Sequence, residues 1–300
     1  FQDMPAEQRA ALKLDSVSLF SITDMATCRD INELLRSMCL AVGGNPADLA
    51  ITDACACVGG NVISFAGCFQ RVHAVEIDAT RSAYLKHNVE QVCGLQNVTC
   101  IHADYATVYR SLAQSIVFFD PPWGGTGYTT TNAVEDLPLG HIKLVDFCLR
   151  LWTEGCCACV VARVPTQYDA LGFCRTLTSD QWNDGAKERP LPFKFQLGPK
   201  ANLLIVCFPP RSHAEKAEPL VFGDKALDAL IQSWRALDAK SKVFKAKFFD
   251  YECDDWVRLG AWHGVTPGSI TPAESMDGSF VIVTTPPRRK LSRDIRENHF

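Results

Sequence analysis

Four apolar runs of the chain are predicted to be strands that each end in an acidic residue, and these four acids are the first candidates for chemistry. They are Asp53, Asp78, Asp104 and Asp120. Short apolar runs separated by helix-like stretches are typical of parallel β-strands joined by helices. The carboxyl ends of parallel strands meet along one crevice, where open α/β sheets bind ligands. We therefore expect the four carboxylates to gather around one ligand.

The loop after the first acid indicates which ligand this is. It reads C-A-C-V-G-G-N over residues 55–61, where Gly59 and Gly60 let the backbone approach a bound molecule closely. A dinucleotide site needs G-x-G-x-x-G to cradle a pyrophosphate, and this loop does not have that pattern. Carboxylates without a phosphate loop favour cationic S-adenosylmethionine, with Asp78 at the ribose and Asp104 near the adenine edge. The alternative is a generic α/β fold whose acids only solvate strand ends.

The fourth acid opens the segment Asp-Pro-Pro-Trp-Gly-Gly at residues 120–125. A rigid turn of this kind suits methyl transfer to an exocyclic amine. Asp120 and the Pro121 carbonyl would accept hydrogen bonds from the amine and align its lone pair with the methyl sulfonium. Trp123 would stack on the base, and a cationic base would gain about 0.5–2 kcal/mol from cation–π attraction. The alternative is a proline-rich turn with a core tryptophan.

The segments around these motifs must hold them in place. A helix is predicted over residues 139–152, a fifth strand over 157–165, and a terminal hairpin from 193–197 and 202–208. We divide the chain into an N-terminal segment, an α/β core and a C-terminal extension, which span residues 1–45, 46–210 and 211–300. In the extension we predict a helix over 225–237 and a short strand over 280–284.

Three segments, in order, make the chain resemble the trimethylguanosine synthase family. That family converts 7-methylguanosine caps of small RNAs to the 2,2,7-trimethyl form. Residues 53–61 are close to its D-A-F-C-G-x-G-G-N motif, and residues 120–125 to its S-P-P-W-G-G motif. Residues 13–15 and 19–23 match its K-L-D and F-S-x-T elements at identical spacing. The resemblance covers about residues 10–209.

This resemblance implies a fold, a cofactor and residue roles. The fold would be a Rossmann-like class I methyltransferase of the α/β class: a seven-stranded, mostly parallel sheet with a terminal antiparallel hairpin, an N-terminal helical segment and a C-terminal extension. S-adenosyl-L-methionine would be bound by Ser21, Thr23, Asp53, Ala54, Gly59, Asn61, Asp78, Asp104 and Asp120. The catalytic amine site would be formed by Asp120, Pro121, Pro122 and Trp123. Further substrate contacts would come from Lys13, Phe20 and Thr166. No metal ion is implied.

Two positions depart from the family pattern. Asp120 stands where the family has Ser, and Asp occurs there in amino-methyltransferases that act on adenine or guanine. Thr166 stands where the family has an Arg that contacts cap phosphates. Arg163 is close in sequence, but strand alternation predicts that it points to the other side.

Three functions follow as hypotheses. The first is methyl transfer to the 2-amino group of a 7-methylguanosine RNA cap. The second is an amino-methyltransferase acting on adenine or guanine within RNA or DNA, which Asp120 favours. The third is a non-catalytic subunit of a capping assembly, which the missing Arg allows.

Charge and composition limit the partners. A net charge of -4 argues against a histone-like nucleic-acid binder. We expect the core to recognise a cap locally, while basic clusters near 235–247 and 288–296 contact RNA or a protein partner. The 14 cysteines read as intracellular thiols, without distinguishing nucleus from cytoplasm. No apolar run reaches the length of about 18 residues that a membrane span needs, and no signal peptide is visible.

Overall fold

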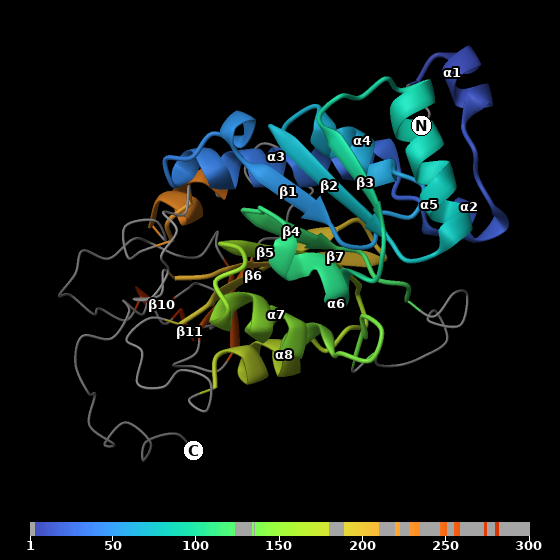
Figure 1. Ribbon diagram of the computed structural model, residues 1–300. Coiled ribbons are helices and arrows are strands. Elements are labelled where there is room, and N and C mark those ends of the chain that lie inside the picture. Colours follow the sequence, from blue (N-terminus) through green and yellow to red (C-terminus); the bar gives the residue numbers. More distant parts are fainter. Residues whose placement is uncertain are drawn as a thin grey trace.

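The computed structural model describes residues 4–123, 134, 136–179, 189–209, 220–222, 228–234, 247–250, 255–258, 273–274 and 280–281. The described residues form a twisted α/β sheet with helices packed on both faces (Figure 1).

Nine strands form the main sheet, in the order β3-β2-β1-β4-β5-β7-β6-β8-β9. The first five strands of this order run parallel, and β7, β6, β8 and β9 pair antiparallel. The strands are β1 (Ala50–Asp53), β2 (Arg71–Glu76), β3 (Val98–His102), β4 (Ile116–Phe119), β5 (Cys159–Pro165), β6 (Leu191–Leu197), β7 (Ala201–Cys207), β8 (Lys247–Asp250) and β9 (Asp255–Arg258). The central strands β1, β4 and β5 are mostly apolar because helices bury both of their faces.

The helices form one layer on each side of the sheet (Figure 1). On one side lie α3 (Met25–Ala41), α4 (Gly60–Ala66) and α5 (Ala79–Lys86), and on the other α6 (Tyr105–Val108), α7 (Leu144–Thr153) and α8 (Ala170–Leu177). Two short helices, α1 (Ala6–Ala11) and α2 (Ser16–Ser21), precede α3. Asp24 caps α3 by accepting a hydrogen bond from the backbone N–H of Thr27 at 3.0 Å. Helix α3 then buries Ile31, Leu34, Leu35 and Met38, an apolar stripe at helical spacing.

The predicted seven-stranded class I arrangement with its antiparallel hairpin is confirmed in β1 to β7. Two further strands were not predicted: β8 pairs with β6 and carries β9 at the sheet edge. The helix predicted over 139–152 begins only at Leu144, because residues 139 and 142 form an isolated bridge before it.

The helix that begins at Ala79 changes type before it ends. After α5 it continues as a π-helix, His87–Val92. The reason is Asn88, which is fully buried and bonds two distant backbone segments. Its side chain accepts a hydrogen bond from the Lys13 N–H at 2.8 Å and donates to the carbonyls of Lys13 and Val58, each at 3.0 Å. The wider π turn therefore ties the N-terminal segment to the loop after β1.

Parts of the C-terminal extension pack on the same core. The described helical residues 228–234 place Trp234 against Phe193 and Phe195 of β6, with ring centroids 4.7 and 4.9 Å apart. The Trp234 indole N–H donates to the Leu34 carbonyl of α3 at 3.3 Å. The three-part division of the chain stays a prediction, since packing continues across residue 210.

Two further described segments form a separate two-stranded sheet, β10 (Ala273–Glu274) and β11 (Phe280–Val281). Among the helices that the structure describes, none combines the length and the apolar character needed to cross a bilayer.

Candidate active site

The strand-end acids occupy two different kinds of position. Asp53 is the last residue of β1 and is buried, and Asp120 directly follows β4, as predicted. Asp78 and Asp104 instead lie two residues beyond the ends of β2 and β3, where each caps a helix. Their Oδ1 atoms accept hydrogen bonds from the backbone N–H groups of Arg81 and Ala106, both at 2.9 Å. The prediction that these two acids end their strands was wrong, because the chain turns into a helix there.

Glu76 is the acid that ends β2, and the sequence reasoning missed it. Its side chain is buried beside the loop after β1. Oε2 accepts a hydrogen bond from the Cys57 N–H at 2.9 Å, and Oε1 accepts one from the Asp78 N–H at 2.9 Å. The sequence signal was weak, because the apolar Ile77 follows Glu76 and its 61% exposure is visible only in the structure.

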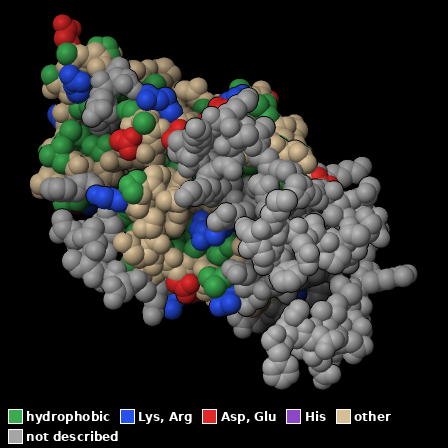
Figure 2. All heavy atoms as spheres, turned by 180° about the vertical axis from the view of Figure 1, so that it is seen from behind, with side chains coloured by type: hydrophobic (Ala, Val, Ile, Leu, Met, Phe, Trp, Pro, Cys, Tyr) green, Lys and Arg blue, Asp and Glu red, His purple; other side chains and the backbone are tan. Residues whose placement is uncertain are grey.

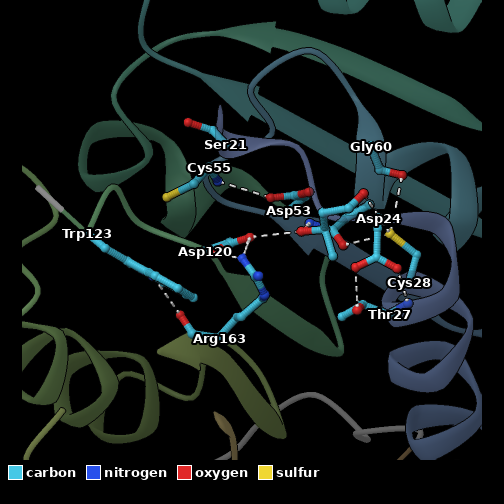
Figure 3. Close-up of polar contacts among 12 residues, drawn as sticks. Ser21, Asp24, Thr27, Cys28, Asp53, Cys55, Gly60, Asp120, Trp123 and Arg163 are labelled. Carbon is cyan, nitrogen blue, oxygen red and sulfur yellow. Dashed lines mark hydrogen bonds and ion pairs between the residues drawn. The ribbon is translucent and has the colours of Figure 1, made fainter. Parts of the chain in front are cut away.

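Asp120 is held by a network that crosses three elements (Figure 3). The Thr23 hydroxyl donates to Asp120 Oδ2 at 3.2 Å, and the Asn61 amide donates to Thr23 Oγ1 at 3.2 Å. The Cys28 thiol in turn donates to Asn61 Oδ1 at 3.3 Å. The structure thus brings together Thr23, Asn61 and Asp120, which the sequence assigned to one site.

Arg163 of β5 completes this network, which corrects the prediction that it points away. Its Nη1 donates to Asp120 Oδ1 and Oδ2 at 3.2 and 3.1 Å. Phe119 pairs in register with Ala162, so Asp120 and Arg163 lie next to each other across two strands. A buried carboxylate needs a counter-charge, and Arg163 supplies it.

The guanidinium of Arg163 also covers Trp123. It lies 4.6 Å from the centre of the indole ring, within the range of cation–π attraction. The Trp123 indole N–H donates to the Arg163 carbonyl at 3.4 Å (Figure 3). We call Arg163, Asp120 and Trp123 the site cluster.

Burial changes the protonation of the acids at this edge. Burial raises the pKa of the Asp53 carboxyl to about 8, and the charges of Asp120 and Glu76 add to that rise, while the Cys55 N–H opposes it. Burial also raises the pKa of Asp120, although Arg163 opposes the rise. Each carboxylate here would be stabilised by a cationic ligand.

The structure also describes four other predicted site residues. Pro121 is buried and Pro122 is exposed, and the Ala54 N–H donates to the Phe118 carbonyl at 2.9 Å. Ser21 is exposed, and its hydroxyl donates to the Val17 carbonyl at 3.0 Å rather than to the Asp120 network.

Two of the predicted substrate contacts are described, and one is not. Lys13 has an exposed side chain and is tied by its backbone to Asn88. Thr166 lies in the turn after β5, where its hydroxyl donates to Gln167 Oε1 at 3.2 Å. The side chain of Phe20, and residues 124 and 125 of the Asp-Pro-Pro-Trp-Gly-Gly segment, lie outside the described residues.

The loop between β1 and α4 has the form of a cradle for a ligand. Gly59 has a φ of 101°, a conformation that side chains rarely adopt. A Cβ on Gly60 would lie 3.4 Å from Ile22 Cγ2 and 3.6 Å from the Thr23 carbonyl, so the N-terminal segment packs closely on this loop. With Asp53 and Glu76 beside it, the loop fits a cationic ligand that bears hydroxyl groups, as S-adenosylmethionine does. The described residues contain no group of three metal-ligating side chains.

The strand order, with antiparallel β7 between β5 and β6, is that of the class I methyltransferase fold. Residues 49–151 match the family described as RNA cap guanine-N2 methyltransferase, which confirms the predicted resemblance over this segment. The matched segment contains Asp53, Glu76, Asp120 and Trp123, whereas Thr23 and Arg163 lie outside it.

Two curated relatives share part of the sequence. An uncharacterized protein of Acanthamoeba polyphaga mimivirus is 36% identical over 125 residues, which cover 40% of this chain and 48% of that protein. Trimethylguanosine synthase of Schizosaccharomyces pombe is 38% identical over 96 residues, which cover 29% of this chain and 39% of that protein. The chain thus spans less than half the length of either relative.

Among solved structures, precorrin-6y C5,15-methyltransferase from Geobacter metallireducens is similar over 67% of this chain and 95% of that one, with 14% identity and a TM-score of 0.39.

Proposed function

We propose that this protein is an S-adenosylmethionine-dependent methyltransferase that acts on the exocyclic 2-amino group of a 7-methylguanosine RNA cap. The observation that carries the proposal is the placement of Asp120 and Trp123 at the carboxyl edge of the sheet, next to the acidic Gly59–Gly60 loop. The match of residues 49–151 to the cap guanine-N2 family supports it.

Asp53, Glu76 and the Gly59 loop would hold the cofactor. S-adenosylmethionine supplies an electrophilic methyl group on a sulfonium. Asp53, deep at the end of β1, suits the ammonium of the methionine part. Glu76 takes the ribose role first assigned to Asp78, because Glu76 ends the strand while Asp78 Oδ1 already caps α5. Asp104, at the start of α6, keeps its proposed place near the adenine edge.

Asp120 has acceptor capacity left for the amine. A carboxylate offers about four lone-pair sites. Arg163 uses one site on each oxygen and Thr23 uses a second site on Oδ2. Oδ1 therefore retains one site for an amine hydrogen, and the Pro121 carbonyl is proposed to accept the other. The nitrogen would take the methyl group from the sulfonium, the methyl–sulfur bond would break and S-adenosylhomocysteine would leave, and water or Asp120 would accept the proton that the product ammonium loses.

Mass spectrometry of reaction products tests the proposal. The protein is incubated with S-adenosylmethionine and a 7-methylguanosine cap dinucleotide, and the nucleosides are then analysed for methylation at N2. We expect N2-methylated 7-methylguanosine from the wild type and none from Trp123→Ala, which loses the stacking surface but keeps cofactor binding. No product from the wild type would reject the proposal.

Trp256→Phe is the matched control. Trp256 of β9 also carries a cation over its ring, Lys194 Nζ at 4.6 Å, but it lies four strands away from β5. We expect this variant to methylate the cap at the wild-type rate. Loss of cofactor binding in Trp123→Ala would instead make Trp123 a structural residue.

One observation favours a second candidate. Asp120 in place of the family's Ser supports an amino-methyltransferase for adenine or guanine within RNA or DNA. The same nucleoside analysis on uncapped RNA and DNA separates the two, since this candidate predicts a methylated base without a cap. A non-catalytic subunit of a capping assembly predicts no binding of S-adenosylmethionine, which calorimetry measures.

With this function we propose capped RNA as the partner and an intracellular location. Of the predicted basic clusters only Lys247 lies within the described residues, so the clusters fall outside what the structure tests. On the face shown in Figure 2, the described basic and acidic side chains are scattered rather than gathered by sign. This distribution is compatible with recognition that centres on the cap base.

A further inference from the structure

The ion pair in the site cluster has an incomplete geometry. Arg163 reaches both oxygens of Asp120 through one nitrogen, Nη1, and its Nε is buried without a hydrogen-bond partner. An arginine that only balances a carboxylate usually forms a two-nitrogen fork. The Arg163 guanidinium forgoes that fork and lies over the Trp123 ring.

The chain provides a comparison for this geometry in Arg110, Glu154 and Tyr109, which we call the distal cluster. Arg110 uses Nε and Nη2 on the two Glu154 oxygens, each at 2.7 Å, while its guanidinium lies 4.6 Å from the Tyr109 ring centre. Stacking on a ring and a complete fork are therefore compatible in one arginine. The missing fork at Arg163 is a property of the site.

Arg163 changes what Trp123 can do for a ligand. One face of the indole is occupied by a guanidinium that the protein itself supplies, and the indole N–H is bonded to the same residue's carbonyl. A base that stacks on the opposite face meets a ring whose electrons already attract a cation. Arg163 also offsets the negative charge of Asp120, which would otherwise attract a positively charged base.

We infer that Arg163 is a specificity-determining residue of the base site. By placing a resident positive charge on Trp123 and offsetting Asp120, it limits how strongly the site prefers a positively charged, N7-methylated guanine over neutral guanine. This inference rests on the proposed function, and it assigns the discrimination between the two bases to a residue outside the family-matched segment.

Calorimetry with two cap dinucleotides tests this assignment. Dissociation constants are measured for the 7-methylated and the unmethylated cap, with S-adenosylhomocysteine present, and their ratio is compared between variants. We expect Asp120→Ser with Arg163→Met to raise the preference for the methylated cap by about 2- to 30-fold, the range that a cation–π contact supplies. Arg163→Met alone should raise it further, because the Asp120 carboxylate then attracts the cation without a counter-charge.

Two further variants protect the test from a folding defect and from a general charge effect. Arg163→Gln keeps a polar side chain beside Asp120 and should also raise the ratio. The double variant Arg110→Met with Glu154→Ser removes the same groups from the distal cluster and should leave the ratio at its wild-type value. Melting temperature and S-adenosylhomocysteine affinity report on folding.

Different outcomes would overturn the role of Arg163 and the proposed function on which it rests. An unchanged or lower ratio in both Arg163→Gln and the Asp120–Arg163 double variant overturns the role of Arg163 alone. A wild-type protein that binds neither cap overturns the proposed function, and this inference with it.

Discussion

The site cluster and the distal cluster each combine an arginine, a carboxylate and an aromatic ring, and they lie at opposite ends of the strands. The site cluster lies where β4 and β5 end, whereas the distal cluster lies in the segments that lead into these strands. Tyr109 and Arg110 belong to η3 (Tyr109–Ser111), and Glu154 directly follows α7. In the site cluster the side chains of Arg163 and Asp120 are 19% and 10% exposed. In the distal cluster the Arg110 side chain is 65% exposed, so water can solvate the guanidinium N–H groups that do not bond Glu154.

The comparison shows that hydrogen-bond geometry and burial do not go together in the two clusters. The exposed cluster has the better hydrogen-bond geometry but gains little from it, because solvent already screens the charges. The buried cluster has the poorer geometry in a place where an unmade hydrogen bond is costly. A ligand site must accept the cost of unmade hydrogen bonds, because its polar groups have to remain available to a ligand.

The largest expected difference comes from removing each arginine alone. Arg163→Met leaves Asp120 as a buried carboxylate without its counter-charge, so we expect a loss of about 3–5 kcal/mol in the free energy of unfolding. Arg110→Met leaves Glu154 partly solvated and should unfold close to the wild type. Urea titration measures both, and equal losses would show that the two clusters do not differ in kind.

A double-mutant cycle in each cluster gives the next largest effect. Replacing Asp120 by Ser together with Arg163→Met should cost less than the two single changes added, with a coupling of about 1–3 kcal/mol. The corresponding cycle of Arg110 and Glu154 should be close to additive. If the distal pair couples as strongly as the site pair, burial is not what sets the clusters apart.

Solution pH should act in opposite directions on the two regions. The hydrogen bonds from Arg110 lower the pKa of Glu154, so the stability it contributes is present above its unfolded pKa and is lost as pH falls. Burial raises the pKa of Asp53 to about 8, so the native state holds more protons than the unfolded state and stability falls as pH rises toward 8.

Cofactor affinity measures the Asp53 effect directly. An ammonium group binds the ionised carboxylate, so affinity for S-adenosylhomocysteine should rise by up to about tenfold per pH unit from pH 6 to the Asp53 pKa of about 8. Asp53→Asn should bind more weakly and with a flat profile in calorimetry. A variant that keeps the wild-type slope would assign the titration to another group.

The smallest effect concerns backbone strain beside the buried cluster. Cys57 has a φ of 50° in the loop where the family pattern has Gly, and its N–H donates to Glu76. Among the described residues it alone has a positive φ without being glycine. Cys57→Gly should therefore stabilise the protein by about 1 kcal/mol or less, the strain relieved minus the added freedom of the unfolded chain. A loss of stability in thermal unfolding would show that the thiol side chain contributes packing that outweighs the strain.

Much of the fold follows from local sequence signals. Continuous apolar runs ending in acids located β1 and β4, and the break at residues 198–199 located the β6–β7 hairpin. The strands and the hairpin depend on residues that are close in sequence. Thr23 and Asn61 came instead from the resemblance to the trimethylguanosine synthase motifs, and the structure joins them at Asp120.

The features that could not be predicted depend on distant pairings. The choice between Glu76 and Asp78 turned on where β2 ends, a boundary that periodicity places only within a few residues. The orientation of Arg163 follows from the register of β5 against β4, together with the need of a buried Asp120 for a counter-charge. The π-helix exists because Asn88 bonds the backbone of Lys13, 75 residues away.

The pairing of β8 with β6 bears on how this chain is synthesised. Until residues 247–250 leave the ribosome, β6 is an open edge that presents unpaired backbone groups. Phe193 and Phe195 on that strand also lack their Trp234 cover until residue 234 has emerged. The nascent protein thus already contains the residues of the candidate active site while β6 is still an unpaired, adhesive edge strand. A fragment ending at residue 209 would keep that adhesive edge permanently, and it should self-associate during expression.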